Sequence, residues 1–128
     1  MSESPIFLAA KSHQETARQH RRLLHQNPEL AFQEYKTSDY AAKELEKLGF
    51  DVRRGIGKTG LVATLAMEHS GPRFLLRFDM DALAVQEQTG LEFTSMSEGT
   101  MHACGHDGHT AIVLALAIDS FVLARQRR

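Results

Sequence analysis

The distribution of apolar and charged residues predicts two helices before residue 50. Residues 12–25 are mostly good helix formers, and Pro28 stops the stretch because it lacks a backbone donor and disfavours helical geometry in the residue before it. Thr37 is placed to cap a second helix, and Gly49 is placed to end it. The apolar residues of this second helix fall on one face, at Tyr40, Ala41, Leu45 and Leu48.

Short strands and loops are predicted in the middle of the chain. Residues 50–54 and 61–67 carry the apolar and β-branched content of strands, and a glycine-rich turn over 55–60 separates them. A third short apolar strand is predicted at 73–78, directly before two aspartates. A long loop follows over 84–100. The order helix, helix, strand, strand, strand, helix predicts one α/β unit.

The final helix, predicted from His109 to about Ala124, is apolar on nearly every side. Such a helix needs cover on several faces, and two amphipathic helices with three short strands supply little. We therefore expect part of this helix to remain uncovered. An uncovered apolar helix also offers a surface for self-association.

The turn at residues 55–60 has some features of a phosphate-binding loop, because it contains Gly-Lys-Thr after two glycines. A P-loop needs four residues between its first glycine and Gly-Lys-Thr, and a helix after it. Gly55 and Gly57 are separated by one residue, and a strand is predicted to follow. The spacing favours a plain turn between two strands.

Composition narrows the function classes. The chain has 128 residues, of which 42% are hydrophobic and 24% charged, and its net charge is −1. This is the composition of a globular domain, with no cationic excess to hold nucleic acid or an anionic membrane. The longest apolar run, residues 111–118, is far shorter than the roughly 20 residues that span a bilayer. The first twelve residues carry no recognisable export signal. These features predict a soluble, cytoplasmic chain.

The residues that carry chemistry are concentrated between Met101 and His109, which enclose three histidines, the single cysteine and one aspartate. Thiolate and imidazole are the ligands that Zn²⁺, Mn²⁺ and Co²⁺ accept, and a nearby carboxylate can orient an imidazole. Glycines at 105 and 108 allow the backbone to turn sharply there. We therefore expect Cys104 and His106 to be metal ligands.

A structural interpretation of the same residues stays open. His102 and His109 are each more simply read as hydrogen-bonded structural histidines, and Asp107 as a helix N-cap. Cys104 and His106 alone do not complete a site, because catalytic zinc takes at least three protein ligands. Asp79 and Asp81 follow an apolar strand, where a cation would offset the cost of burying two carboxylates. Either aspartate is therefore a candidate for a further ligand.

Four segments together resemble the N-terminal signature of the M20 family of metallopeptidases and amidohydrolases. The strongest are Arg77–Leu83 and Glu98–Ala111, and Arg21–Glu34 and Thr59–Ala63 fit the same pattern in the same order. The similarity is to the branch that contains hippurate hydrolases, N-acyl-amino-acid amidohydrolases and auxin-conjugate hydrolases. It covers nearly all of the chain from Arg21 to Ala117.

The resemblance implies the N-terminal part of an α/β catalytic domain, with a mixed sheet flanked by helices. It implies two divalent ions, Mn²⁺ or Zn²⁺, and hydrolysis of the amide bond of N-acyl amino acids. Cys104 matches the residue that bridges or approaches both ions, and His106 matches a ligand of one. Asp81 matches the aspartate that orients the site, while Asp79 stands where other branches place a histidine ligand.

The resemblance also implies parts that the sequence does not contain. Family members continue into two adjacent glutamates, one of them the general base, then two more histidine ligands and a lid or dimerisation domain. After His109 the only acidic residue is Asp119, and no histidine follows. We therefore expect residues 1–128 to be a partial catalytic domain, truncated and inactive alone. The alternative is a non-catalytic module that binds a metal or a partner chain.

Overall fold

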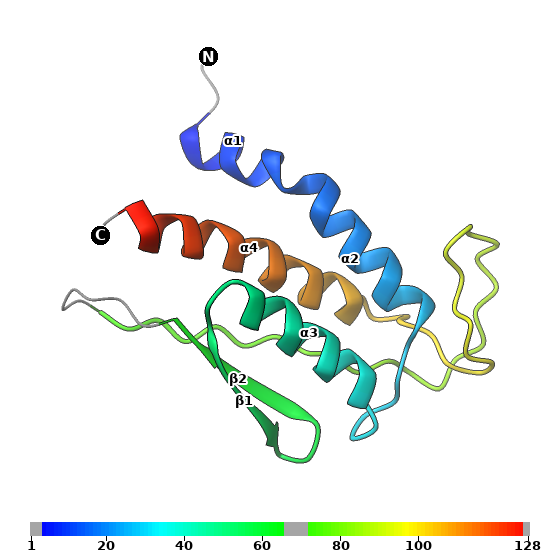
Figure 1. Cartoon of the computed structure of the whole chain (residues 1–128). Coiled ribbons are helices and arrows are strands. Elements are labelled where there is room, and N and C mark those ends of the chain that lie inside the picture. The colour runs from blue at the N-terminus through cyan, green and yellow to red at the C-terminus, as the bar shows by residue number, and fades with distance from the viewer. Residues whose placement is uncertain (1–3, 66–71, 127–128) are drawn as a thin grey trace.

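A computed structural model describes residues 4–65 and 72–126, with side chains described as far as residue 120. In chain order the elements are α1 (Pro5–Ser12), α2 (Gln14–Gln26), α3 (Tyr35–Lys47), β1 (Asp51–Ile56), β2 (Gly60–Thr64) and α4 (His106–Gln126). Helices α2 and α4 pack along each other, and α3 lies between α4 and the β1–β2 hairpin (Figure 1). None of the helices in these ranges is long and apolar enough to cross a membrane.

The hydrophobic core lies between α3, α4 and the hairpin. Leu45, Leu114 and Ala117 are its buried centre, each less than 5% exposed. Partly buried side chains from these elements and from the connection between α3 and β1 surround them: Tyr40, Leu48, Phe50, Val52, Leu61, Ala63 and Val113. The predicted apolar face of the second helix is therefore confirmed, and it packs against the last helix.

The two strands form an antiparallel hairpin, as the sequence predicts for this region, and the glycine-rich segment is the turn between them. The register shifts between Arg54 and Ile56, where Gly55 has a φ of +74°. A residue without a Cβ adopts this left-handed conformation easily, so the bulge falls at the glycine. A strand rather than a helix follows the turn, which excludes a P-loop here.

The predicted third strand is wrong. Residues 72–81 are extended but form no strand among the described residues. Phe74, Leu75 and Leu76 are 86%, 90% and 57% exposed. A strand is stabilised only when a neighbouring backbone completes its hydrogen bonds, and no such neighbour lies along this stretch within the described ranges. Residues 74–76 are therefore exposed apolar side chains on an extended segment whose backbone pairs with no strand among the described residues.

One additional helix and two helix boundaries differ from the predictions. Helix α1 was not expected, and it begins with Pro5 at its first turn and buries no side chain. Helix α3 begins at Tyr35, so Thr37 lies inside its first turn and is not the N-cap. Its backbone N and Oγ1 both donate to Glu29. Helix α4 begins at His106, three residues earlier than expected, and this shift is important for the site.

We predict that Leu114→Ala lowers the free energy of unfolding by about 2–5 kcal/mol, because it leaves a cavity at the most buried leucine of the core. Ile112→Ala is the matched control on the same helix. Ile112 is 57% exposed, so its truncation should cost less than about 1 kcal/mol. Urea denaturation measures both, and equal losses would contradict this description of the core.

The contact between α2 and α3 predicts a pH dependence of stability. His20 Nδ1 lies 2.6 Å from Tyr40 Oη, and burial lowers the pKa of His20 despite the nearby carboxylate of Glu44. The unfolded chain, with an ordinary histidine pKa of about 6.5, then takes up its proton at a higher pH than the folded chain. Stability contributed by neutral His20 is lost as the pH falls below this value.

We therefore expect the urea midpoint of the wild type to fall more than that of His20→Gln between about pH 7.5 and about pH 5. The glutamine keeps a polar group of similar length beside Tyr40 but does not titrate. An identical fall in both proteins would show that His20 does not contribute.

Candidate metal centre

The segment that carries the two aspartates is fixed by backbone hydrogen bonds to two distant parts of the chain. Ala82 N donates to Glu29 O at 2.8 Å. Leu83 and Met101 exchange both backbone hydrogen bonds, at 2.9 and 3.0 Å. These bridges place Asp79 and Asp81 beside the loop that leads into α4, although 25 residues or so separate them in sequence.

The loop turns into α4 through Gly105, whose φ of +100° few other residues adopt. Because the helix begins at His106, His106 and His109 lie three residues apart on its first turn. Side chains at this spacing lie on the same helix face, and the two rings stack with their centroids 5.1 Å apart.

Asp79, His106 and His109 together form a candidate ligand group. Each offers one ligand atom, and the three atoms all lie within 4.8 Å of one another. His109 Nδ1 and Asp79 Oδ2 are 3.8 Å apart, too far for a hydrogen bond. Two ligands that each bind a tetrahedral zinc at about 2.1 Å are separated by about 3.4 Å. The ligand atoms are therefore slightly farther apart than in a zinc-bound site, and small side-chain rotations would bring them to ligand distance.

Asp81 orients the His106 ring. His106 Nδ1 lies 2.9 Å from Asp81 Oδ1 and 3.0 Å from the Asp81 carbonyl oxygen. Both partners accept, so Nδ1 is the donor and Nε2 is the nitrogen left to bind a metal ion. A carboxylate in this position fixes the tautomer and makes the imidazole a stronger ligand. Two imidazoles and a carboxylate, one imidazole held in this way, are a donor set that fits Zn²⁺ or Mn²⁺.

A buried polar network adjoins the ligand group through Asp107, the residue that follows His106. His25, from α2, lies between Asp107 Oδ2, 2.8 Å from its Nδ1, and Glu87 Oε1, 3.2 Å from its Nε2. The three side chains are at most 4% exposed. Arg21 Nε also approaches Asp107, at 3.3 Å, and the other Asp107 oxygen accepts from Gly108 N. The network joins α2, the 84–100 loop and the first turn of α4.

Hydrogen bonds keep Glu87 ionised in this interior. Burial raises the pKa of its carboxyl, but hydrogen bonds from Thr89, the backbone of Ser95 and His25 outweigh burial, so the pKa lies below its usual value. His102 lies beside the network, with its ring centroid 6.4 Å from that of His25. It is 4% exposed, and burial lowers its pKa. Neither ring nitrogen has a partner among the described residues.

The structure brings together some of the predicted site residues and separates another. The structure brings His106 and Asp81 into contact. Cys104 is exposed and is not a member of the three-residue ligand group found in the described ranges. Asp107 lies inside the helix rather than before it, so it is not the N-cap.

The sequence alone favours a structural role for His109, and the structure places its side chain in the candidate ligand group. Its signal was present in the sequence, since histidines three apart at a helix start share one face. The pairing of His25 with Asp107 had no such signal, because 82 residues separate the two.

Comparison with known proteins identifies the class. The fold is of the α/β class, and residues 75–119 match the model of peptidase family M20/M25/M40. The chain is 47% identical over 97 residues to hippurate hydrolase of Campylobacter jejuni, covering 76% of this chain and 25% of that protein. It is 45% identical over 97 residues to the N-acyl-L-amino acid amidohydrolase of Geobacillus stearothermophilus, covering 76% and 26%.

A solved structure of a family member has a similar fold. The YXEP protein of Bacillus subtilis, described as a dinuclear metal binding peptidase from the M20 family, superposes with a TM-score of 0.82 at 39% identity. The alignment covers 89% of this chain and 32% of that one. The chain is a relative of peptidase family M20. It spans about a quarter of the length of the curated relatives it matches.

We predict that His25→Ala lowers the free energy of unfolding by about 3 kcal/mol, because it leaves Asp107 and Glu87 buried without their shared partner. His13→Ala is the matched control. His13 Nε2 bonds Asp119 at 2.7 Å, but both side chains are more than 20% exposed, so its loss should cost less than about 1 kcal/mol. Similar losses from denaturant titrations of the two variants would contradict a supporting role for His25.

Proposed function

We propose that the chain contributes one wall of a divalent-metal site for hydrolysis of the amide bond of N-acyl amino acids. The observation that carries the proposal is the grouping of Asp79, His106 and His109, with Asp81 holding the His106 ring. This grouping lies within residues 75–119, the segment that matches the family model. The amidohydrolase names of the relatives support the substrate class.

In this proposal Cys104 and His106 are metal ligands, and Asp79 and His109 are available to complete the set. Cys104 is exposed and precedes His106 by two residues, so its thiol is accessible to an ion. The resemblance supports two ions, with Mn²⁺ or Zn²⁺ as the metal. A bound divalent ion would supply Lewis acidity, which polarises an amide carbonyl and acidifies water.

In this proposal the chain's own residues orient the metal ligands and do not transfer protons. Asp81 keeps the His106 ring in one tautomer and aims Nε2 at the ligand group. Asp79 is engaged by Arg77 Nη2 at 2.6 Å. With both carboxylates engaged, the proton acceptor that amide hydrolysis needs is supplied from elsewhere. We propose that residues 1–128 act as part of a catalytic domain, inactive or weakly active alone, and that they work in the cytoplasm.

Metal binding tests the site directly. We expect Zn²⁺ binding measured by calorimetry to be nearly abolished in His106→Ala and clearly weakened in Cys104→Ala. Asp81→Asn should lower the affinity by about 10–100-fold, because it removes the carboxylate that orients His106. Asp51→Asn, on an exposed strand position, is the control and should bind as the wild type does. Failure of the unsubstituted chain to bind Zn²⁺ would contradict the proposed site.

Hydrolysis tests the function. With added Mn²⁺ or Zn²⁺, the chain alone should release little or no amino acid from N-acetyl and N-benzoyl amino acids. Turnover at the rate of a full-length relative would refute the claim that the chain is only part of the catalytic apparatus.

A second candidate function is a non-catalytic module that binds a metal or another chain. The observation that favours it is the exposed apolar side of α4, where Ile112 and Leu116 are 57% and 40% exposed. Surface apolar groups of this kind support association, including self-association. Cys104→Ala separates the candidates, since a module would keep its partner binding when metal binding is lost. Sedimentation velocity of the chain and of Ile112→Glu measures self-association.

A further inference from the structure

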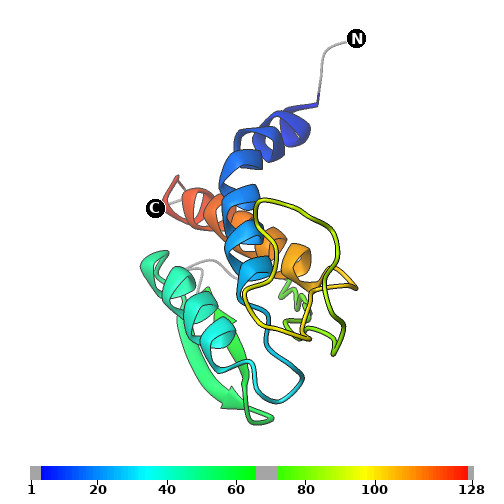
Figure 2. The ribbon, with the colours of Figure 1, turned by 90° about the vertical axis from the view of Figure 1, so that its right-hand side faces the viewer.

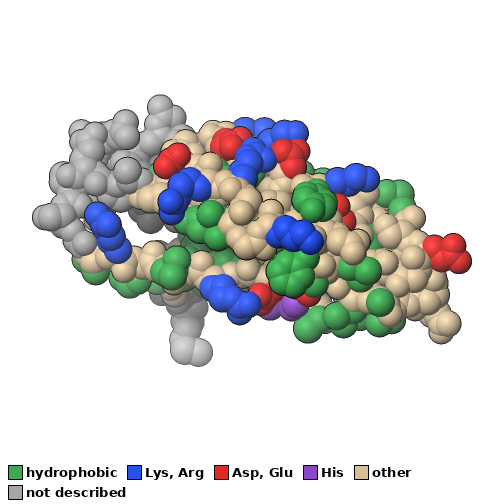
Figure 3. Space-filling model, turned by 90° about the horizontal axis from the view of Figure 1, so that it is seen from below, with side chains coloured by type: hydrophobic (Ala, Val, Ile, Leu, Met, Phe, Trp, Pro, Cys, Tyr) green, Lys and Arg blue, Asp and Glu red, His purple; other side chains and the backbone are tan. Residues whose placement is uncertain are grey.

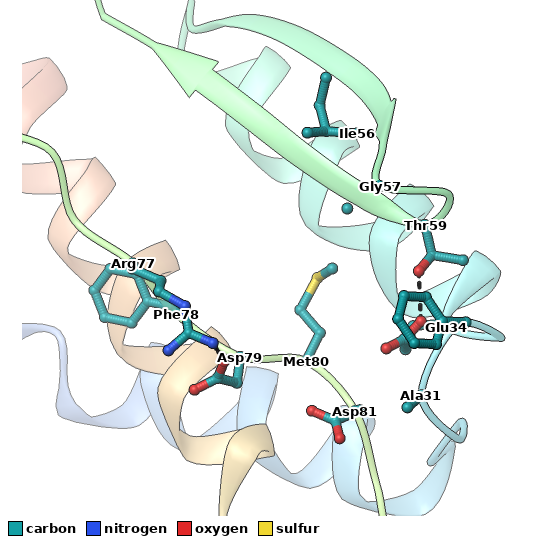
Figure 4. Close-up of a pocket in the computed structure, with 12 residues that line it drawn as sticks. Ala31, Glu34, Ile56, Gly57, Thr59, Arg77, Phe78, Asp79, Met80 and Asp81 are labelled. Atoms are coloured by element: carbon teal, nitrogen blue, oxygen red, sulfur yellow. Dashed lines mark hydrogen bonds and ion pairs between the residues drawn. The ribbon is translucent and has the colours of Figure 1, made fainter.

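A cavity of about 320 Å³ lies beside the ligand group, between the β1–β2 hairpin and residues 77–81 (Figure 4). Its volume is at the lower end of the range for small-molecule sites. Asp79 and Asp81 line it, and the same two side chains contact His109 and His106. The cavity is therefore continuous with the proposed metal site.

One end of the cavity is apolar. Figure 4 shows Met80 extended toward the hairpin, with Ile56 beyond it and Ala31 on the opposite side. Ile56 and Phe32, which also line the cavity, are 47% and 62% exposed. Large apolar side chains exposed around a concave space are typical of a binding site, because an apolar ligand removes both surfaces from water.

Phe32, which lines this end, and Lys58, which lies between the lining residues Gly57 and Thr59, have strained backbones. Phe32 and Lys58 have φ values of +63° and +95°, in the left-handed region that side chains of their size rarely adopt. Lys58 Nζ lies 5.9 Å from the centroid of the Phe32 ring. Strain of this kind persists where surrounding structure maintains it, and it is concentrated at ligand sites. It gives independent support to a binding role for the apolar end.

The other end of the cavity carries a cation. Arg77 is 84% exposed, and its guanidinium pairs with Asp79 through one nitrogen. A guanidinium has five N–H donors, so it can also bind a carboxylate of a ligand. Three carboxylates line the cavity, and each already has a partner: Thr59 donates to Glu34, Arg77 to Asp79 and His106 to Asp81. The guanidinium is thus the group with donors to offer an anion.

The surrounding surface has the same mixed character. The face seen from below shows hydrophobic side chains interspersed with basic and acidic ones around a histidine (Figure 3). In the cavity Arg77 and Ile56 lie on different sides, with Asp79 and Met80 between them and Asp81 below Met80 (Figure 4). An amide with a carboxylate on one side and an apolar group on the other would match the separation of Arg77 from the apolar side chains.

We propose that this cavity selects the substrate, with Arg77 binding the carboxylate of an N-acyl amino acid and Phe32, Ile56 and Met80 contacting a large apolar acyl group such as benzoyl. The proposal rests on the proposed function and extends it to the residues that choose the substrate. The amide bond then lies over Asp79 and Asp81, beside the ligand group.

Binding to the full chain in the presence of Zn²⁺ tests the proposal without requiring turnover. The probes are N-benzoylglycine, N-acetylglycine and the neutral N-benzoylglycinamide, titrated while amide chemical shifts are followed by NMR. N-benzoylglycine should bind about tenfold more tightly than either of the others, which lack the large apolar group or the carboxylate. The largest shifts should be those of Gly57, Gly60 and Met80, which line the cavity.

Matched variants assign the two ends. Arg77→Gln should weaken N-benzoylglycine about tenfold and leave N-benzoylglycinamide unchanged, whereas Arg73→Gln, an exposed residue of the same segment outside the cavity, should change neither. Phe32→Asn removes the ring and keeps a residue that tolerates positive φ. It should reduce the preference for benzoyl over acetyl, and Ile112→Ala on the distant face of α4 should not.

Three results would overturn the proposal: shifts confined to residues outside the cavity, equal binding of the acetyl and benzoyl probes, or an equal effect of Arg77→Gln on the charged and neutral probes. Its failure is distinguishable from failure of the proposed function. The predicted binding pattern without any metal-dependent hydrolysis in a reconstituted enzyme would count against the function alone. Hydrolysis with a KM unaffected by Arg77→Gln and Phe32→Asn would count against the cavity alone.

Discussion

The site depends most on the buried contact between His25 and Asp107. Asp107 is fully buried one residue after His106, and His25 Nδ1 lies 2.8 Å from its carboxylate. Because Glu87 binds the other His25 nitrogen, the start of α4 is tied at once to α2 and to the 84–100 loop, which lie together in Figure 2. An unpaired charge in this interior would be costly, so the three groups hold one another in a single arrangement. That arrangement determines where His106 and His109 point.

Much of this could be predicted from sequence where local patterns determine the outcome. The glycines at residues 55–60 predict the hairpin turn. The spacing of apolar residues predicts the buried face of α3, because helical periodicity is a local property of the sequence. The density of ligand types between Met101 and His109 pointed to a metal site for the same reason. Residues 73–78 were misassigned as a strand because a strand requires a partner that the local pattern does not reveal. The His25 network joins residues far apart in sequence, so only the fold could reveal it.

The structure combines exposed apolar surface with a three-residue candidate ligand group. Residues 74–76 and one side of α4 present large hydrophobic side chains. The ligand group holds two imidazoles and a carboxylate, and the carboxylates that line the adjoining cavity in the described part of the chain are all paired. Both features are expected of one wall of a larger site. Asp81 nevertheless fixes the His106 ring, and the cavity beside it carries a cation and apolar side chains, which are the features that the proposed ligand binding uses. In the proposed function, metal binding and substrate selection are therefore separable from the proton transfer that completes hydrolysis.

The most direct test of this account is X-ray absorption spectroscopy of the chain loaded with one equivalent of Zn²⁺. Ligation by His106 and His109 predicts imidazole nitrogens at about 2.0–2.1 Å, and the proposed ligation by Cys104, which lies outside the three-residue group, adds one sulfur at about 2.3 Å. The imidazole signal should diminish in His106→Ala, and the sulfur shell should disappear in Cys104→Ala. A zinc ion surrounded only by oxygen, unchanged in both variants, would contradict a metal centre at the start of α4.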